Sequence, residues 1–377
     1  MSNELPATPA PIRVALLFGG RSSEHAVSCV TAAGVLGAID DSKYDVVPIG
    51  IAKNGQWVLV GNEIKNWSLT AGELPEVKAG ERTLALAHLR GSQQLVASVA
   101  GEPLQELGAV DVVFPLLHGP WGEDGTVQGV LELGDTRYVG AGVLASALGM
   151  DKHFMKVVFA AAGLAVGPYI AVTDRQWSVD PEQVRQRVAA LGFPVFVKPA
   201  RAGSSMGISR VDSLAGLDLA IAAAREHDLK LVIEAAIVGR EIEVAVLQGR
   251  GHEGPRVSLP GEIAMVDSDH AFYDFEAKYV SGGAASLSCP ADLPEADLAR
   301  VREQAALAFD AVGAEGLSRV DFFYTAAGEV LINEINTMPG FTPSSMYPQM
   351  WAATGLGYSE LIDELLQLAL NRPVGLR

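Results

Sequence analysis

Cysteine is scarce in this chain of 377 residues, in which only Cys29 and Cys289 occur. The two cysteines lie far apart and lack the spacing of metal ligands, which argues against a disulfide framework and against a cysteine-based metal site. Such sparing use of thiols is typical of a reducing compartment, and we therefore expect a cytoplasmic protein.

Positive charge is also in deficit, and no apolar run reaches the length of a membrane span. The chain has 28 Lys and Arg against 45 Asp and Glu, a net charge of -17. Such a surface repels nucleic acid and anionic lipid, so we expect neither nucleic acid nor membrane as a partner. Residues 1–11 carry three prolines but no basic segment followed by an apolar core, which predicts a short disordered tail and not a signal peptide.

The length is too great for one hydrophobic core and predicts two or three domains. Near the N-terminus, three apolar runs have the composition of buried parallel strands. They are Ile12–Phe18, Asp45–Ile51 and Val110–Leu116. We expect them to form a doubly wound α/β unit with the helical segments around them. Residues 57–105 have scattered Gly and Pro, so we expect loops there and assign them no role.

A predicted β-hairpin near the C-terminus carries the most informative polar residues. Two apolar runs, Val320–Tyr324 and Val330–Ile335, flank the turn Ala-Ala-Gly-Glu. Side chains two residues apart on a strand share a face, so the hairpin can gather one guanidinium, two carboxylates and one amide. These side chains belong to Arg319, Asp321, Glu334 and Asn336. Their hard oxygen atoms suit Mg2+; the alternative is a hairpin whose polar residues only face solvent.

Two glycine-containing turns predict sites for polar or anionic ligands. One turn follows the first strand as Gly-Gly-Arg-Ser-Ser and leads to Glu24 at the start of a helix; alternatively, Glu24 is an ordinary helix acid favoured by the helix dipole. The other turn follows Lys198 and contains Gly-Ser-Ser-Met-Gly at 203–207, whose N–H groups can cover a phosphate. Its spacing matches neither the phosphate-binding loop nor the dinucleotide fingerprint, and a plain Gly-Ser hairpin is the alternative.

Several single residues have both a functional and a structural interpretation. His118 follows a strand and begins the string His-Gly-Pro-Trp-Gly-Glu-Asp-Gly-Thr. It either forms the wall of a ligand site or is a histidine at a strand end whose hydrogen bonds are satisfied within the protein. Glu123, in the same string, is expected to orient or cap and not to catalyse. Glu234 ends another strand, and Glu241 lies on the charged face of the next one. By pattern alone, Lys152 is an exposed helix lysine.

The segment Asn-Glu-Ile-Asn-Thr-Met-Pro-Gly at 333–340 resembles the metal-binding signature of the ATP-grasp ligases. With the motifs above, the chain from about Val14 to its C-terminal helix resembles the D-alanine–D-alanine ligase family. The resemblance implies an α/β protein with α+β lobes: an ATP-grasp fold preceded by a doubly wound, parallel-sheet N-terminal domain. We expect a tail at 1–11, an N-terminal domain at 12–148, a central lid domain at 149–236 and a C-terminal domain at 237–377.

The resemblance also implies roles for individual residues. Glu24 would bind the ammonium of the first substrate and would form a hydrogen-bonded set with Ser204 and Tyr279. The other residues expected at the substrates and the reacting atoms are His118, Arg319, Gly340, Ser345 and Met346. The residues expected at ATP are Lys152, Lys198, Ser205, Glu234, Glu241, Lys278 and Asn333. Two Mg2+ or Mn2+ ions would be held by Asp321, Glu334 and Asn336.

The implied reaction joins two D-alanines for peptidoglycan precursor synthesis. ATP would phosphorylate the first D-alanine to an acylphosphate, which the amine of the second would attack. A ligase that takes D-lactate or D-serine second is an alternative, against which Tyr279 argues. A regulatory protein that binds nucleotide without turnover is another, and the intact hairpin argues against it. The family is usually dimeric, so we expect a homodimer; activation by a monovalent cation stays open.

Overall fold

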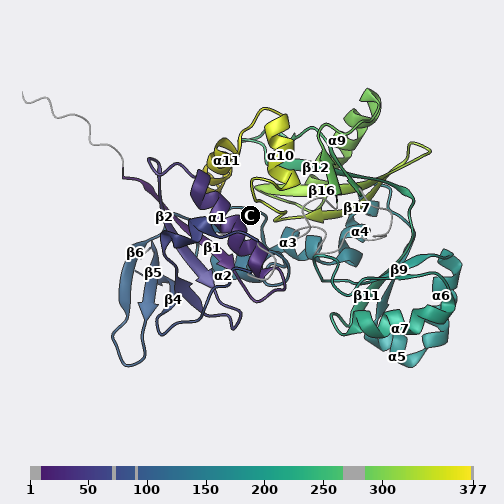
Figure 1. The fold of residues 1–377 in the computed structure, drawn as a ribbon, viewed down its shortest axis with the longest axis horizontal. Coiled ribbons are helices and arrows are strands. Elements are labelled where there is room, and N and C mark those ends of the chain that lie inside the picture. Colours follow the sequence, from purple (N-terminus) through teal and green to yellow (C-terminus); the bar gives the residue numbers. More distant parts are fainter. Residues whose placement is uncertain (1–9, 70–73, 90–91, 266–284, 375–377) are drawn as a thin grey trace, which may run out of the picture.

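The computed structural model describes residues 10–69, 74–89, 92–265 and 285–374. The chain forms three lobes (Figure 1), with the N-terminal lobe at the left, the central lobe at the lower right and the C-terminal lobe above them. Lys278 and Tyr279, expected at the nucleotide and at the reacting centre, lie outside the described residues. In the described part of the chain, no helix is both long and apolar enough to cross a membrane.

The N-terminal lobe is built on a sheet with strand order β3-β2-β1-β7. Its elements are β1 (Ile12–Gly19), α1 (His25–Ala38), β2 (Tyr44–Ile51), β3 (Trp57–Leu59), β7 (Val112–Pro115), α2 (Thr126–Leu133) and α3 (Val143–Met150). β1 lies inside the sheet because residues 14–18 are fully buried apolar side chains, and it pairs in parallel with β2 and β7. The three predicted strands are therefore confirmed, although β7 is shorter than expected.

The expectation of loops across residues 57–105 is wrong. Besides β3, the segment and its immediate continuation contain η1 (Asn62–Asn66), β4 (Thr83–Leu89), β5 (Ser92–Ser98) and β6 (Gln105–Ala109). The strands β4, β5 and β6 pair antiparallel in that order, and Leu84 and Leu95 are buried in a core shared with β1 and β2. The alternation Thr-Leu-Ala-Leu-Ala-His-Leu indicates a strand with one apolar face, and the neighbouring glycines obscured it.

The central lobe has an antiparallel sheet with strand order β10-β9-β11-β8. Its elements are β8 (Tyr169–Thr173), α5 (Asp174–Val179), α6 (Pro181–Leu191), β9 (Val195–Pro199), β10 (Ser209–Val211), α7 (Leu214–Arg225) and β11 (Lys230–Ala235). The sequence pattern did not predict α5, which begins with a capping box at Thr173. Apolar residues of α6, α7 and the sheet form a separate core that includes Val188, Val197 and Leu217.

The C-terminal lobe has a sheet with strand order β15-β14-β12-β16-β17, and β13 pairs with β12. Its strands are β12 (Gly239–Leu247), β13 (Arg256–Val257), β14 (Gly261–Met265), β15 (Ala285–Ser288), β16 (Leu317–Thr325) and β17 (Val330–Asn336). Its helices are α9 (Glu295–Ala311), α10 (Met346–Ala353) and α11 (Tyr358–Leu370), joined by α4 (Lys152–Ala161). Met155 and Phe159 of α4 belong to the same core as β12, β16 and β17. The predicted hairpin is confirmed.

The N-terminal and C-terminal lobes share one hydrophobic core. It joins Val14 and Phe18 of β1 to Phe341 and to Leu361 and Leu365 of α11. The core of the central lobe contains residues only of that lobe. The N-terminal and C-terminal lobes therefore form one packed body, to which the central lobe is attached. The domain limits 12–148, 149–236 and 237–377 stay a prediction.

The core of the central lobe gives a first testable prediction. Leu217 is fully buried on α7, whereas Leu219 on the same helix is 78% exposed. Leu217→Ala should lower the free energy of unfolding of this lobe by about 2–5 kcal/mol because it leaves a cavity, while Leu219→Ala should change it by less than about 0.5 kcal/mol. Urea denaturation followed by tryptophan emission measures both, since Trp177 packs against this core. Equal effects would contradict the assigned packing.

Candidate active site

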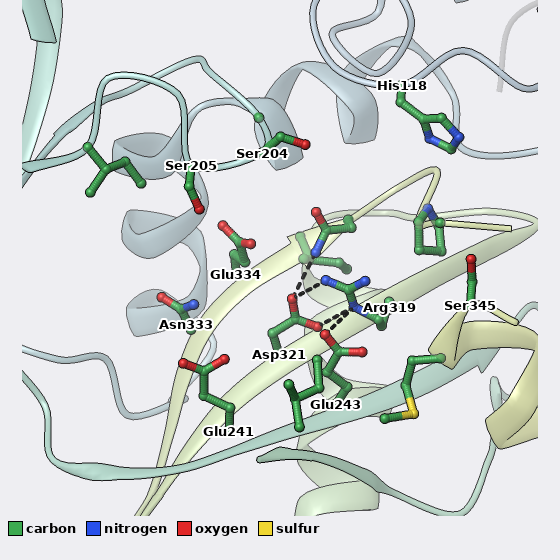
Figure 2. Close-up of a pocket in the computed structure, with 18 of the residues that line it drawn as sticks. His118, Ser204, Ser205, Glu241, Glu243, Arg319, Asp321, Asn333, Glu334 and Ser345 are labelled. Carbon is green, nitrogen blue, oxygen red and sulfur yellow. Dashed lines mark hydrogen bonds and ion pairs between the residues drawn. The ribbon is translucent and has the colours of Figure 1, made fainter. Parts of the chain in front are cut away.

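A cleft of about 1400 Å³ is lined by residues of all three lobes. Figure 2 shows side chains from these lobes directed toward it: His118 from the N-terminal lobe, Ser204 and Ser205 from the central lobe, and Arg319 and Asp321 from the C-terminal lobe. Residues that are distant in the sequence therefore meet at one site, as is usual for ligand pockets at domain interfaces.

The hairpin β16–β17 gathers the four predicted polar side chains at the floor of the cleft. Asp321 lies opposite Glu334, and Arg319 lies opposite Asn336, with a β-bulge directly after Asp321. Arg319 donates from Nε and Nη2 to the two carboxylate oxygens of Asp321 at 2.7 and 2.6 Å. Asn336 Nδ2 donates to Asp321 Oδ2 at 3.0 Å. The predicted shared face is therefore present (Figure 2).

Glu243 adds a second carboxylate to Arg319, in a role that the sequence pattern did not predict. It lies on β12 opposite Asp321, with Oε1 3.2 Å from Arg319 Nε. Burial alone would lower the pKa of the guanidinium, but the charges of Asp321 and Glu243 raise that pKa well above its ordinary value. The sequence did offer a signal for this role, because Glu243 lies two residues after Glu241, and this spacing places both acids on one face of the strand.

The hairpin donors fit a divalent cation of the Mg2+ type. Asp321 and Glu334 supply carboxylates, and the amide of Asn336 turns its nitrogen to Asp321, which leaves its carbonyl oxygen as a further donor. Among the described residues, no three side chains of the types His, Cys, Asp and Glu converge on one metal position. Two carboxylates and an amide oxygen are the incomplete oxygen set that Mg2+ accepts when substrate phosphates and water complete its coordination.

Lysines gather around Glu234 next to the hairpin. Lys198 Nζ lies 2.7 Å and Lys156 Nζ 3.2 Å from the Glu234 carboxylate. Burial would raise the pKa of Glu234, but the two ammonium charges outweigh it and lower that pKa to about 2. Lys152 lies 3.8 Å from Glu334 and donates to the carbonyl of Ala202 at 2.9 Å. The predicted lysines thus reach the cleft.

Lys156 is a residue of this cluster that the sequence analysis missed. It is buried on α4 and donates to the main-chain carbonyl of Asn333 at 3.2 Å. Its spacing of four from Lys152 places both lysines on the same helix face, and that spacing was the available signal. Ser205, Glu241 and Asn333 also line the cleft, as do Trp67 and Ser68 from the segment to which no role was assigned.

Glu24 lines the same cleft from the N-terminal lobe and is buried at the start of α1. It accepts a hydrogen bond from the hydroxyl of Ser204, which comes from the central lobe. A side chain at Gly119 would place its Cβ 2.5 Å from Glu24 Oε2, and one at Gly203 would place it 2.7 Å away. The carboxylate is therefore enclosed by two loops that are glycine where they approach it.

His118 is held as a neutral imidazole. Its Nδ1 lies 3.0 Å from the carbonyl oxygen of Met338, so Nδ1 carries the hydrogen, and Nε2 accepts from the hydroxyl of Thr31 at 3.2 Å. Burial lowers the pKa of the ring. The ring is thus satisfied, as the structural interpretation expected, and it also lines the cleft.

Glu123 is half-buried beside the cleft and accepts two main-chain hydrogen bonds. Oε2 accepts from Gly119 N–H at 2.7 Å, and Oε1 accepts from Met338 N–H at 3.0 Å. Burial and the charge of Glu24 raise the pKa of Glu123 to about 8, against the opposing effects of the two N–H groups and Arg319. The expectation that Glu123 orients its surroundings is consistent with these contacts.

The remaining predicted residues lie beyond the hairpin. Ser345 precedes α10 and accepts from Thr342 N–H at 3.1 Å. Met346 is buried below β14, where a Cβ on Gly261 would be 2.7 Å from its sulfur. Gly340 lines the cleft together with Ser345 and Met346. The start of a helix of eight residues therefore faces the cleft, a position that favours a carboxylate.

Two family models cover most of the chain. One is described as D-ala D-ala ligase N-terminus and matches residues 13–141. The other is described as D-ala D-ala ligase C-terminus and matches residues 158–367. A D-alanine–D-alanine ligase of Arthrobacter sp. (strain FB24) is 76% identical over 365 residues, which are 97% of this chain and 96% of that protein. The similarity therefore spans the whole site.

Solved structures of two ligases have the same fold. The D-alanine-D-alanine ligase from Coxiella burnetii is 34% identical, with a TM-score of 0.78 and coverage of 96% of this chain and 94% of that one. The VanG D-Ala:D-Ser ligase from Enterococcus faecalis is also 34% identical, with a TM-score of 0.78 and coverage of 95% and 99%. Fold similarity alone therefore does not separate the two second substrates.

Titration of Glu123 tests the electrostatics of the cleft. In protein with carbon-13 in its glutamate carboxyl groups, the NMR signal that Glu123→Gln removes should have a midpoint near pH 8. Glu24→Gln should lower that midpoint because it removes a neighbouring negative charge. Since an ordinary glutamate ionises near pH 4.5, Glu123 should make the free energy of unfolding fall as the pH rises from there to about 8. A midpoint unaffected by Glu24→Gln would contradict this account.

Proposed function

The chain belongs to the D-alanine–D-alanine ligase family, and we propose that the residues gathered in its cleft perform the family reaction in the roles given below. The protein is an ATP-dependent ligase that joins two D-alanines, and the product serves peptidoglycan synthesis. Three curated relatives that are 73–76% identical are named D-alanine–D-alanine ligases, and none of the three supports D-lactate or D-serine as the second substrate.

One observation carries the assignment of roles. A single cleft is lined both by an enclosed carboxylate, Glu24, and by a hairpin of carboxylates with adjacent lysines. A carboxylate must be activated before an amine can displace its oxygen at neutral pH. Phosphoryl transfer needs positioning and neutralisation of charge, which the lysines and the hairpin donors are suited to supply.

At the phosphate end, the proposed roles are electrostatic. Lys152 and Lys198 would neutralise the phosphates of ATP, and Lys156 would keep Glu234 in place between them. Asp321, Glu334 and Asn336 would hold two Mg2+ or Mn2+ ions, which when bound offset the negative charge that develops on the transferred phosphoryl group. The other residues proposed at the nucleotide are Ser205, Glu234, Glu241, Lys278 and Asn333.

At the first-substrate end, Glu24 would accept the ammonium group of D-alanine. Its hydrogen bond from Ser204 connects the N-terminal lobe to the loop of the central lobe that covers the cleft. His118 would form part of the wall for the same substrate. With Tyr279, the pair Glu24–Ser204 would close the site, and closure would keep water from the acylphosphate.

The second step would form a tetrahedral intermediate with a negatively charged oxygen. Arg319 and the N–H group of Gly340 would stabilise that oxygen. Glu243 would keep Arg319 oriented, because it binds the guanidinium alongside Asp321. Ser345 and the N–H groups at the start of α10, from Met346 onward, would bind the carboxylate of the second D-alanine.

We also propose a homodimer and a cytoplasmic location. The exposed apolar side chains of Val130 and Leu133 on α2, and of Val143 and Leu144 on the neighbouring helix α3, support an interface with a second copy. ATP as substrate and two unpaired cysteines support the location. Leu144→Glu should yield a monomer in analytical ultracentrifugation, whereas Val179→Glu, which is equally exposed on α5, should leave the mass unchanged. A dimer of unaltered stability in Leu144→Glu would contradict the proposed interface.

The hairpin acids provide the direct test of the reaction. With ATP, Mg2+ and D-alanine, Glu334→Gln should lower the rate of phosphate release by about a hundredfold or more, because the metal donor set loses a charge. Glu329→Gln is the control, since Glu329 is exposed at the turn of the same hairpin. ATP binding should persist in both variants.

Two outcomes would contradict this proposal. Undiminished turnover in Glu334→Gln would exclude its role at the metal. Turnover by the unaltered enzyme only in mixtures of D-alanine with D-serine or D-lactate would favour the alternative second substrates. Comparison of potassium and sodium salts in the same assay measures any activation by a monovalent cation.

A further inference from the structure

Both main-chain polar groups of Met338 are held by side chains of the N-terminal lobe. Its N–H donates to Glu123 Oε1 at 3.0 Å, and its carbonyl oxygen accepts from His118 Nδ1 at 3.0 Å. Met338 follows β17 in the C-terminal lobe, so these two hydrogen bonds join two lobes at the edge of the cleft. The two hydrogen bonds together fix the orientation of the peptide groups on both sides of Met338.

The two side chains that hold Met338 are themselves fixed. The second carboxylate oxygen of Glu123 accepts from Gly119 N–H at 2.7 Å. His118 Nε2 is bound to the hydroxyl of Thr31, and the carbonyl of His118 accepts from the Ser22 hydroxyl at 2.7 Å. Neither side chain can turn away without loss of a second hydrogen bond. The position of Met338 is therefore set by the packing of the N-terminal lobe.

Only Pro339 separates Met338 from Gly340. Proline fixes its own φ angle and restricts the backbone angles of the residue before it. The orientation of the Met338 peptide therefore also limits the orientation of the peptide that carries the Gly340 N–H group. We infer that Glu123 is a positioning residue for the second chemical step: by holding the Met338 peptide, it aims the N–H group of Gly340 at the oxygen of the tetrahedral intermediate. This inference rests on the role proposed above for Gly340.

The chemistry of the contact requires the ionised carboxylate, which is the form that Glu123 takes above its pKa of about 8. Each oxygen of Glu123 faces an N–H donor, one on Gly119 and one on Met338. Glutamine has the same shape but only one acceptor oxygen, so its amide nitrogen would face one of the two N–H groups and repel it. Glu123→Gln should therefore release one of the two contacts without leaving a cavity.

Asp124 supplies a matched control. Its carboxylate also accepts two main-chain hydrogen bonds, from Trp121 N–H at 2.8 Å and from Thr126 N–H at 2.9 Å. Both of these contacts stay within residues 121–126, which comprise the loop that contains Asp124 and the first residue of α2. Asp124→Asn thus makes the same chemical change one residue away, and the contacts of Met338 are left intact. A role limited to shaping this loop would give both variants the same effect.

The experiment measures the two chemical steps separately in the full-length enzyme at saturating ATP, Mg2+ and D-alanine, at about pH 9, where Glu123 is ionised. Scrambling of the β,γ-bridge oxygen of labelled ATP reports phosphorylation of the first D-alanine, and dipeptide formation reports both steps. Hydrogen exchange of the Gly340 and Met338 amides reports the order of the segment without any chemistry. In Glu123→Gln, we expect dipeptide kcat to fall about tenfold to a hundredfold, oxygen scrambling to persist and amide exchange to accelerate. Asp124→Asn should behave as the unaltered enzyme in all three measurements.

Each other result has a definite meaning. Unchanged amide exchange and unchanged kcat in Glu123→Gln would overturn the positioning role. Equal losses of oxygen scrambling and dipeptide formation would overturn it too, because they would place Glu123 at the first substrate. Faster amide exchange with an unchanged kcat would instead overturn the proposed role of Gly340. Equal effects of Glu123→Gln and Asp124→Asn would reduce Glu123 to a residue that shapes its own loop.

Discussion

The register of β16 against β17 is the constraint on which the rest of the site depends. It sets Asp321 opposite Glu334 and Arg319 opposite Asn336. A shift of one residue would turn these side chains to the other face of the sheet, where the apolar residues of the core now lie. The register is therefore fixed by burial of Val320, and the polar face is placed as a consequence. Catalytic geometry in this enzyme thus depends on hydrophobic packing behind the hairpin.

The hydrophobic cores determine which parts of the cleft are held in fixed positions relative to one another. The N-terminal and C-terminal lobes share a core, so Glu24 and the hairpin belong to one body. The contacts between the central lobe and that body include polar ones, such as Ser204 with Glu24 and Lys230 with Asp151. Hydrogen bonds and ion pairs can be exchanged for water at a modest cost. The central lobe can therefore separate from the body while Glu24 and the hairpin keep their relative positions.

Local patterns in the sequence predicted the parts of the site that depend on one element. Alternation along a strand was enough to group Asp321 with Arg319, and a spacing of four could also have revealed Lys156. The contact between Glu123 and Met338 joins residues far apart in the chain and depends on how two lobes pack, so no local pattern predicts it. The strands of residues 83–109 were missed because glycines hid a short alternation, and the pairing of Glu234 with two lysines was likewise a tertiary feature.

The separate core of the central lobe also affects how the protein loses its folded structure. Units that share no buried side chains can lose order independently of one another. Damage confined to α6, α7 or their sheet would leave a chain whose body is still folded and in which Glu24 and the hairpin keep their relative positions. Such a partly folded chain would lose Lys198, Ser204 and Ser205 from the lining of the cleft. Loss of order in this one lobe would therefore abolish nucleotide binding before the rest of the protein unfolds.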